Sequence, residues 1–138
     1  MLKQILRQLL LTAQPLLTAQ WLQTQKKNTT TVKQEIKTEP AKGGLTIAAL
    51  FKNKQSYSGK TVKIKGQVTK FSPAIMNKNW IHIQDGTDNS GKFDLTVTTD
   101  IEVKVGDTIT LEGAIALDKD FGFGYKYEVI MEDAKLVK

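Results

Sequence analysis

The stretch "NKNWIHIQDGTDNSGKFDLTVTTD", residues 77–100, contains two runs of alternating side chains with a turn signal between them. The first run sets Ile81 and Ile83 against a second face made of Trp80, His82 and Gln84. The second run sets Phe93, Leu95 and Val97 against Asp94, Thr96 and Thr98. Because a period of two is the pattern of a half-buried strand, the stretch predicts two strands joined by a turn from Asp85 to Gly91.

The same pattern recurs on both sides of this stretch. Upstream, "TVKIKGQVTKF" (61–71) has one face made of Val62, Ile64, Gly66 and Val68. Downstream, "VGDTITLEGAIALD" (105–118) starts with a predicted turn at 105–107. The strand after this turn has an inward face made of Ile109, Leu111, Gly113, Ile115 and Leu117. A last strand follows in "YKYEVIMEDAKLV" (125–137). Gly66 inside a strand predicts a bend, which small barrels need where one strand serves two sheet directions.

Five strands, with glycines inside the first and the fourth, predict a mainly β domain, which we interpret as a five-stranded Greek-key barrel of the OB type. A short helix precedes the strands, with Thr46 as its cap and one face made of Ile47, Leu50 and Phe51. A different barrel or a sandwich is the alternative, because strand order cannot be read from one sequence. In an OB barrel, strands two and three carry the ligand between the loops that join strands one and two and strands four and five.

Composition divides the chain into three regions. In residues 1–22, Lys3 and Arg7 precede a leucine-rich stretch, which is the order of a secretory signal. Residues 23–42 are rich in Thr, Gln and Lys and predict a flexible linker, and residues 43–138 form the predicted OB-fold domain. We expect a periplasmic or otherwise exported protein. The alternatives are a cytoplasmic protein and one held at a membrane surface by an amphipathic leader, since the leader is too short and polar to predict a transmembrane span.

The net charge of +6 is concentrated outside the predicted domain. Residues 1–42 carry seven Lys and Arg against two acids, whereas residues 43–138 carry thirteen Lys against twelve acids. The overall basic balance is therefore weak support for a polyanionic ligand. Within the domain the charge is polarised along the sequence, because seven Lys and no acid lie from Lys52 to Lys78. The absence of cysteine excludes disulfides, thiolate zinc sites and a catalytic thiol.

Several segments together resemble one family of proteins. They are "GKTVKIKGQV", "IMNKNWIHIQDGT", "DLTVTT", "VGDTITLEG", "DKDFGFGYKYEVI" and "EDA", and they lie within residues 44–134. This region is similar to small bacterial, usually exported OB-fold proteins that are described as nucleic-acid-binding or tRNA anticodon-binding-like. The resemblance implies an OB fold, a signal peptide and a role in binding nucleic acid.

The candidate binding residues lie on the second strand, on lysines around it and in an aromatic hairpin. Trp80 and His82 share the polar side of the second strand, where an exposed indole stacks on a base. The alternative is a structural His82 and a Trp80 packed on the loop that contains Ile75. Four lysines are candidates for neutralising phosphates: Lys63, Lys65, Lys70 and Lys78. Three aromatic residues separated by glycines suit ring stacking or, alternatively, closure of the barrel: Phe121, Phe123 and Tyr125.

The chain shows no Ser-His-Asp spacing, phosphate-binding glycine loop or paired carboxylates, so we predict a non-enzymatic protein that needs no cofactor. Three acids near the turn lack the spacing of a calcium loop and are interpreted as turn residues: Asp85, Asp88 and Asp94. The first functional hypothesis is weak, salt-sensitive binding of single-stranded nucleic acid. The second is an exported envelope accessory protein that binds a protein or small ligand, with haem at His82 as a minor variant. A structural subunit that pairs through a sheet edge is the third.

Overall fold

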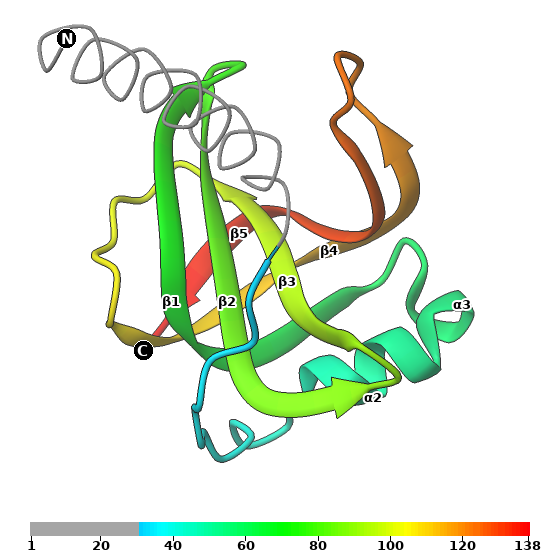
Figure 1. Ribbon diagram of the computed structural model, residues 1–138, viewed down its shortest axis with the longest axis vertical. Coiled ribbons are helices and arrows are strands. Elements are labelled where there is room, and N and C mark those ends of the chain that lie inside the picture. The colour runs from blue at the N-terminus through cyan, green and yellow to red at the C-terminus, as the bar shows by residue number, and fades with distance from the viewer. Residues whose placement is uncertain (1–30) are drawn as a thin grey trace, which may run out of the picture. The chain divides into compact units, whose positions relative to one another are not determined.

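The structure is a computed structural model that describes residues 31–138, and its compact unit runs from Lys33 to Lys138. Residues 31–138 are mainly β, with five strands in one sheet and two short helices, α2 (Ile47–Lys52) and α3 (Lys54–Tyr57) (Figure 1). The predicted leader and the first part of the predicted linker lie outside the described residues. The prediction of export, which depends on the leader, stays a prediction. No helix among residues 31–138 is both long and apolar enough to cross a membrane.

The five strands form one closed sheet. Their bounds are β1 (Thr61–Ile75), β2 (Lys78–Asn89), β3 (Lys92–Thr99), β4 (Thr108–Asp120) and β5 (Lys126–Val137). Their order around the sheet is β1-β2-β3-β5-β4, and β4 pairs back onto β1. All neighbouring strands are antiparallel except β3 and β5, which are parallel. The last strand therefore lies between the third and the fourth.

Strand β1 closes the sheet by pairing with two partners in succession. Its first half pairs with β4, its second half pairs with β2, and Gln67 pairs with both Gln84 and Thr108. Gly66 directly precedes this residue, and a side chain there would start only 3.1 Å from the carbonyl oxygen of Gln84. The bend predicted at Gly66 is confirmed, because β1 changes partners at this place (Figure 1).

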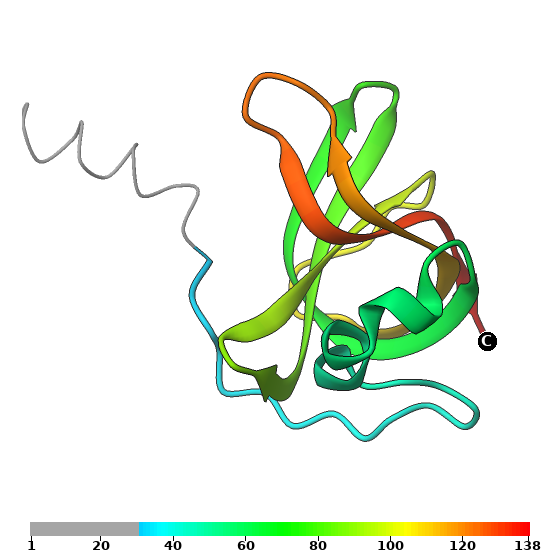
Figure 2. The ribbon, with the colours of Figure 1, turned by 90° about the vertical axis from the view of Figure 1, so that its right-hand side faces the viewer.

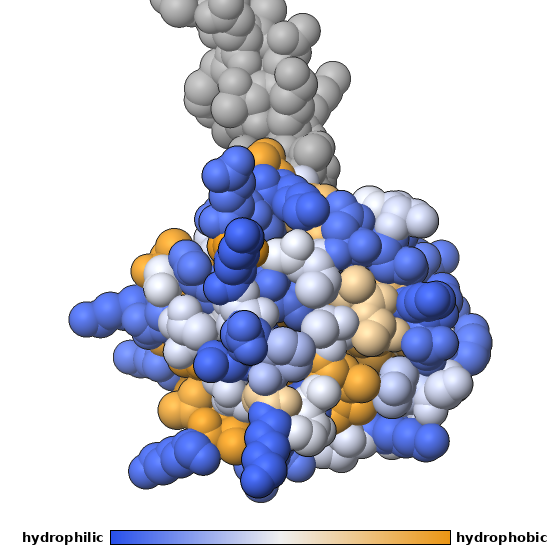
Figure 3. Space-filling view, turned by 90° about the horizontal axis from the view of Figure 1, so that it is seen from below, coloured by the Kyte–Doolittle hydropathy of each residue, from blue (hydrophilic) through white to orange (hydrophobic). Residues whose placement is uncertain are grey.

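The hydrophobic core lies inside the closed sheet, and one helix covers its end. The predicted inward faces supply most of it, including Val62, Ile64, Val68, Ile81, Ile83, Leu95, Val97, Leu111 and Ile115. Helix α2 adds Ile47 and Leu50, which are fully buried, and the Thr46 hydroxyl accepts a hydrogen bond from the Ala49 amide at the helix start. The underside of the molecule presents separate apolar patches among charged side chains (Figure 3).

The turn between β2 and β3 is shorter than the sequence predicts. Strand β2 continues through Asp85 and Gly86 to Asn89, so that only Ser90 and Gly91 separate it from β3. The register is irregular between Gln84 and Asn89, because this part of β2 contacts α2 instead of pairing regularly with β3. The carboxylate of Asp85 accepts the Ile47 amide at 2.8 Å, at the start of α2. Asp85 thus caps a helix and does not form a hairpin turn.

Candidate functional site

The candidate ligand-binding face is the outer side of β2 and β3, opposite the core. Its residues form three cross-strand pairs: Trp80 with Thr98, His82 with Thr96, and Gln84 with Asp94. Two hairpin arms project from the same end of the sheet: the first arm, residues 70–80 of β1 and β2, and the second arm, residues 117–128 of β4 and β5 (Figures 1 and 2). The arms contain the β1–β2 and β4–β5 connections.

Trp80 contacts residues of both arms. Its side chain lies on the predicted face, but only 5% of the residue is exposed. The indole packs in a T-shaped arrangement against the ring of Phe121, with centroids 5.1 Å apart, and its centroid lies 5.8 Å from that of the Tyr127 ring. Its indole Nε1 donates a hydrogen bond to the Ile75 carbonyl at 2.8 Å. The structure therefore gives Trp80 a structural role, since a base cannot reach an indole that is already covered on the second arm's side.

His82 has a carboxylate partner that comes from the neighbouring strand. Its Nδ1 lies 2.7 Å from Oδ2 of Asp94, and both side chains are mostly buried. Sequence reasoning missed this partner because Asp94 is twelve residues away along the chain. The contact with Asp94 fixes the orientation of the imidazole ring. The second oxygen of Asp94 is buried and has no hydrogen-bond partner within the described residues.

The structure separates the four predicted lysines into two pairs. Lys70 lies opposite His82 on the neighbouring strand, and Lys78 lies at the tip of the same arm. Lys63 and Lys65 instead lie on the first half of β1, where they face Glu112 and Thr110 of β4. Only Lys70 and Lys78 therefore belong to the face that the aromatic residues flank.

The second arm carries the other predicted aromatic residues, and they do not point one way. Phe121 packs inward against Trp80, whereas Phe123 is 100% exposed and Tyr125 is 44% exposed. The turn is closed by hydrogen bonds from the Phe121 amide to the Tyr125 carbonyl and from the Tyr125 amide to the Gly122 carbonyl. Phe123 has a positive φ of 55°, between two glycines at 84°, so the turn presents its ring at the tip.

Tyr127 completes the aromatic cluster of Trp80, Phe121 and Tyr127, although it was not among the predicted site residues. Its ring centroid is 6.1 Å from that of Phe121. Burial raises the pKa of its hydroxyl above the ordinary value, and the neighbouring Tyr125 adds to the effect. The signal was present in the sequence, since Tyr127 continues the two-residue spacing of the aromatic residues.

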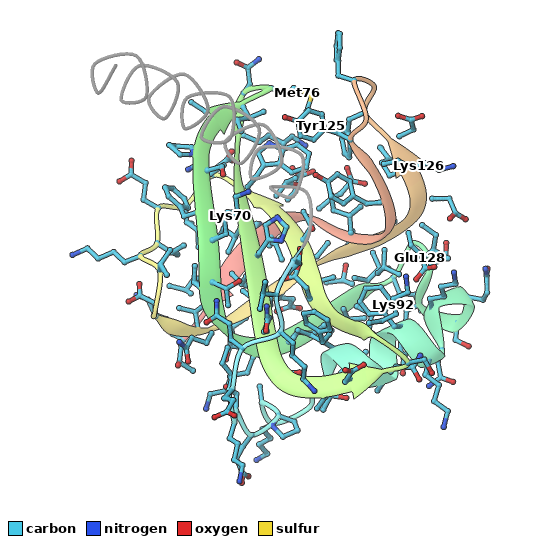
Figure 4. The ribbon with its side chains drawn as sticks, viewed as in Figure 1. Lys70, Met76, Lys92, Tyr125, Lys126 and Glu128 are labelled. Atoms are coloured by element: carbon cyan, nitrogen blue, oxygen red, sulfur yellow. The ribbon has the colours of Figure 1, made fainter. Side chains whose placement is uncertain are left out.

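Most charged side chains around the face are paired with one another. Lys78 pairs with Asp133 at 3.1 Å, Lys119 with Glu132 at 3.5 Å, and Glu128 with both Lys54 and Lys92. Figure 4 shows Lys92 and Glu128 at one side of the sheet and Met76 and Tyr125 on the two arms. Within residues 31–138, Lys70 and Lys126 form no ion pair. The ammonium group of Lys70 is therefore available on the face, whereas Lys126 precedes Tyr127 on β5 and points outward from the second arm (Figure 4).

The three acids of the β2–β3 region are occupied by contacts within the protein. Asp85 accepts the amides of Ile47 and Thr87, and Asp88 accepts the amide of Gly91. Asp94 holds His82. In the part of the chain that the structure describes, no three His, Cys, Asp or Glu side chains gather as the ligands of a metal ion would.

A segment of the predicted linker lies on the candidate face. Residues 33–38, which we name the strap, contact the last part of β2, so the compact unit begins before the predicted domain start at Gly43. The Gln34 amide donates to the side-chain oxygen of Gln84 at 2.9 Å, and the Thr38 amide donates to the Asp85 carbonyl at 3.3 Å. Ile36 between them is only 8% exposed. This part of the linker is therefore packed against the domain.

Chemically, the face and its arms offer exposed aromatic rings at the tips, an oriented imidazole and the ammonium group of Lys70, which forms no ion pair within residues 31–138. These groups suit contact with flat rings and with anions. Comparisons of the chain with protein-family models, with curated proteins and with solved structures find no match.

Proposed function

We propose that this chain is a non-enzymatic binding module of the OB type, a Greek-key barrel whose ligand lies on the outer face of β2 and β3. Three observations support the fold proposal: the strand order β1-β2-β3-β5-β4, the sharing of β1 between two partners, and the two arms that flank the face. The resemblance of residues 44–134 to small bacterial OB-fold proteins agrees with it. Fold alone does not identify the ligand, so the ligand is argued from the side chains.

The ligand that the exposed side chains favour is a single-stranded nucleic acid. The observation that carries this proposal is the tip of the second arm, where Phe123 is 100% exposed and Tyr125 is 44% exposed. Lys70, which forms no ion pair in the part of the chain that the structure describes, lies on the same face as His82. Exposed rings stack on bases of any sequence, and unpaired ammonium groups neutralise phosphates. Trp80 supports the second arm in this mechanism and does not itself stack on a base.

The test measures the binding of a fluorescently labelled oligothymidylate by anisotropy over a range of salt concentrations. Replacing Phe123 by Ala removes one stacking ring, which is worth about 1–3 kcal/mol per base, or about a 5- to 150-fold loss of affinity. Lys70→Ala should lower the slope of log affinity against log salt by about 0.7, the value for one phosphate of a single strand. Val105→Ala, also at an exposed apolar residue, and Lys63→Ala, on the other half of β1, are the matched controls.

Two results would contradict this proposal. The first is equal binding by the Phe123→Ala and Val105→Ala variants, which would show that the exposed ring is not used. The second is the absence of saturable binding at low salt by a protein that circular dichroism shows to be folded. An equal effect of Lys63→Ala and Lys70→Ala on the salt slope would move the phosphate contacts away from the β2–β3 face.

A protein partner is the second candidate, because most charges around the face are already paired. Ion pairs engage Lys78, Lys92 and Lys119, while Met76, Phe123 and Tyr125 expose apolar surface at the two arm tips. Contacts of this kind are largely insensitive to salt. In this proposal the protein is exported and acts in the cell envelope. Crosslinking from the arm tips in intact cells, compared with crosslinking from Val105, distinguishes it, since only the arm tips should capture a specific partner.

A further inference from the structure

We propose that the strap, residues 33–38, is an autoinhibitory segment that covers one end of the ligand-binding face. A nucleic acid that binds this face displaces the strap. This inference rests on the proposed function, because it concerns the same face. It assigns a regulatory role to a segment whose composition predicts only a linker.

The strap lies on the same side of β2 as the candidate binding residues. Gln84, which accepts the Gln34 amide through its side-chain oxygen, shares the outer face with Trp80 and His82. The Lys33 ammonium group reaches Asp88 at 3.4 Å, near the end of β2. Figure 1 shows the strap crossing over β2, and Figure 2 shows it outside the sheet. A strand of nucleic acid that extends along β2 past His82 therefore meets the strap.

The contacts of the strap are few enough to be exchanged for those of a ligand. Ile36 is its one buried side chain, and the side chains of Gln34, Glu35 and Lys37 are exposed. Its other contacts include two amide hydrogen bonds and a partly exposed ion pair. An ion pair of this kind contributes little, and ordering the segment costs backbone entropy. Among these contacts, the burial of Ile36 is the main favourable contribution that a ligand must replace to release the strap.

Gly86 provides a way to release the strap without changing the strap itself. A Cβ atom at Gly86 would lie 1.9 Å from the Ile36 carbonyl oxygen, so Gly86→Ala cannot retain the docked strap. Gly91 has the same φ, +88°, but a Cβ atom there meets nothing within 4 Å. Gly91→Ala therefore reproduces the backbone strain of a left-handed alanine without the collision. The two glycines form a matched pair.

The experiment uses the full chain and compares four proteins: wild type, Gly86→Ala, Gly91→Ala and Ile36→Ser. Hydrogen exchange at the Gln34 and Thr38 amides reports strap release without any ligand. We expect faster exchange at both amides in Gly86→Ala and Ile36→Ser, and wild-type exchange in Gly91→Ala. Oligothymidylate binding reports competition. If the strap is docked in about nine of ten molecules, its release tightens the apparent affinity about tenfold.

The outcomes separate the inference from the proposed function. Tighter binding by Gly86→Ala and Ile36→Ser than by Gly91→Ala supports competition, as does faster exchange of the Gln34 and Thr38 amides when wild type is saturated with oligonucleotide. Equal affinity in all four proteins, despite faster exchange in the two release variants, overturns it. If no protein binds oligonucleotide but the exchange pattern is as expected, nucleic acid is rejected as the ligand, while the strap remains a releasable cover. Unchanged exchange in Gly86→Ala overturns the docking of the strap.

Discussion

Replacing Trp80 by Phe should lower stability while leaving ligand binding intact. Trp80 is 5% exposed, and its Nε1 donates to the Ile75 carbonyl, a hydrogen bond worth about 0.5–1.5 kcal/mol that Phe cannot form. Truncation of a buried Trp or Phe to Ala costs about 3–5 kcal/mol, and Phe keeps part of the contacts with Phe121 and Tyr127. We therefore expect a loss of about 1–3 kcal/mol in the free energy of unfolding. For a domain of this size the melting temperature falls by about 4–8 °C for each kcal/mol.

The assay is urea unfolding followed by far-ultraviolet circular dichroism, because removing Trp80 alters the fluorescence signal itself. Phe123→Leu is the control, for which we expect unchanged stability and weaker oligonucleotide binding. Its stability should stay within about 0.5 kcal/mol of wild type, because Phe123 is 100% exposed, while oligonucleotide affinity should fall. A Trp80→Phe protein with wild-type stability and lost affinity would refute the reasoning, since it would show that the indole contacts the ligand and not the second arm.

Two further predictions concern Asp85 and Tyr127. Asp85→Asn should lower the free energy of unfolding by about 2 kcal/mol, because the buried carboxylate accepts the Ile47 and Thr87 amides and an Asn amide group turned toward them cannot accept. Urea unfolding measures this loss, and an equal loss in the exposed Asp118→Asn variant would disprove the helix-capping role. Because burial raises the pKa of Tyr127, its contribution to stability is complete below about pH 10 and is lost as pH rises further. Tyr127→Phe should thus keep more of its neutral-pH stability at about pH 11 than wild type does, and parallel pH curves of unfolding would contradict this.

The strands could be predicted because local alternation of side chains determines which ones face the core. The inward residues of β1 and β4 and the isoleucines of β2 occupy the buried positions that the alternation indicates. The predicted turn at Asp85-Gly86 was wrong for a tertiary reason. Asp-Gly is a strong hairpin signal, but here Asp85 binds the start of α2 and Gly86 leaves room for the strap.

The candidate site was harder to predict because its contacts join distant parts of the chain. Alternation correctly places Trp80 opposite the core, but the residues that cover it, Phe121 and Tyr127, come from the second arm more than forty positions later. Ile36 is the buried side chain of the strap, and it lies in a polar stretch. A single apolar residue gives no helical or strand periodicity from which its docking could be predicted. Likewise, the separation of Lys63 and Lys65 from Lys70 depends on where β1 changes partners.

The position of β5 between β3 and β4 constrains when this domain can fold. The β1–β2 and β2–β3 hairpins join neighbouring segments and can form as soon as residues 61–99 are synthesised. The β3–β5 pairing, however, needs residues 126–137, and it forms the parallel seam that joins the β1–β2–β3 part of the sheet to β5 and β4. On the ribosome, the first three strands must therefore wait with their core face uncovered until the last strand has emerged, a period in which a nascent chain is exposed to chaperones and to aggregation.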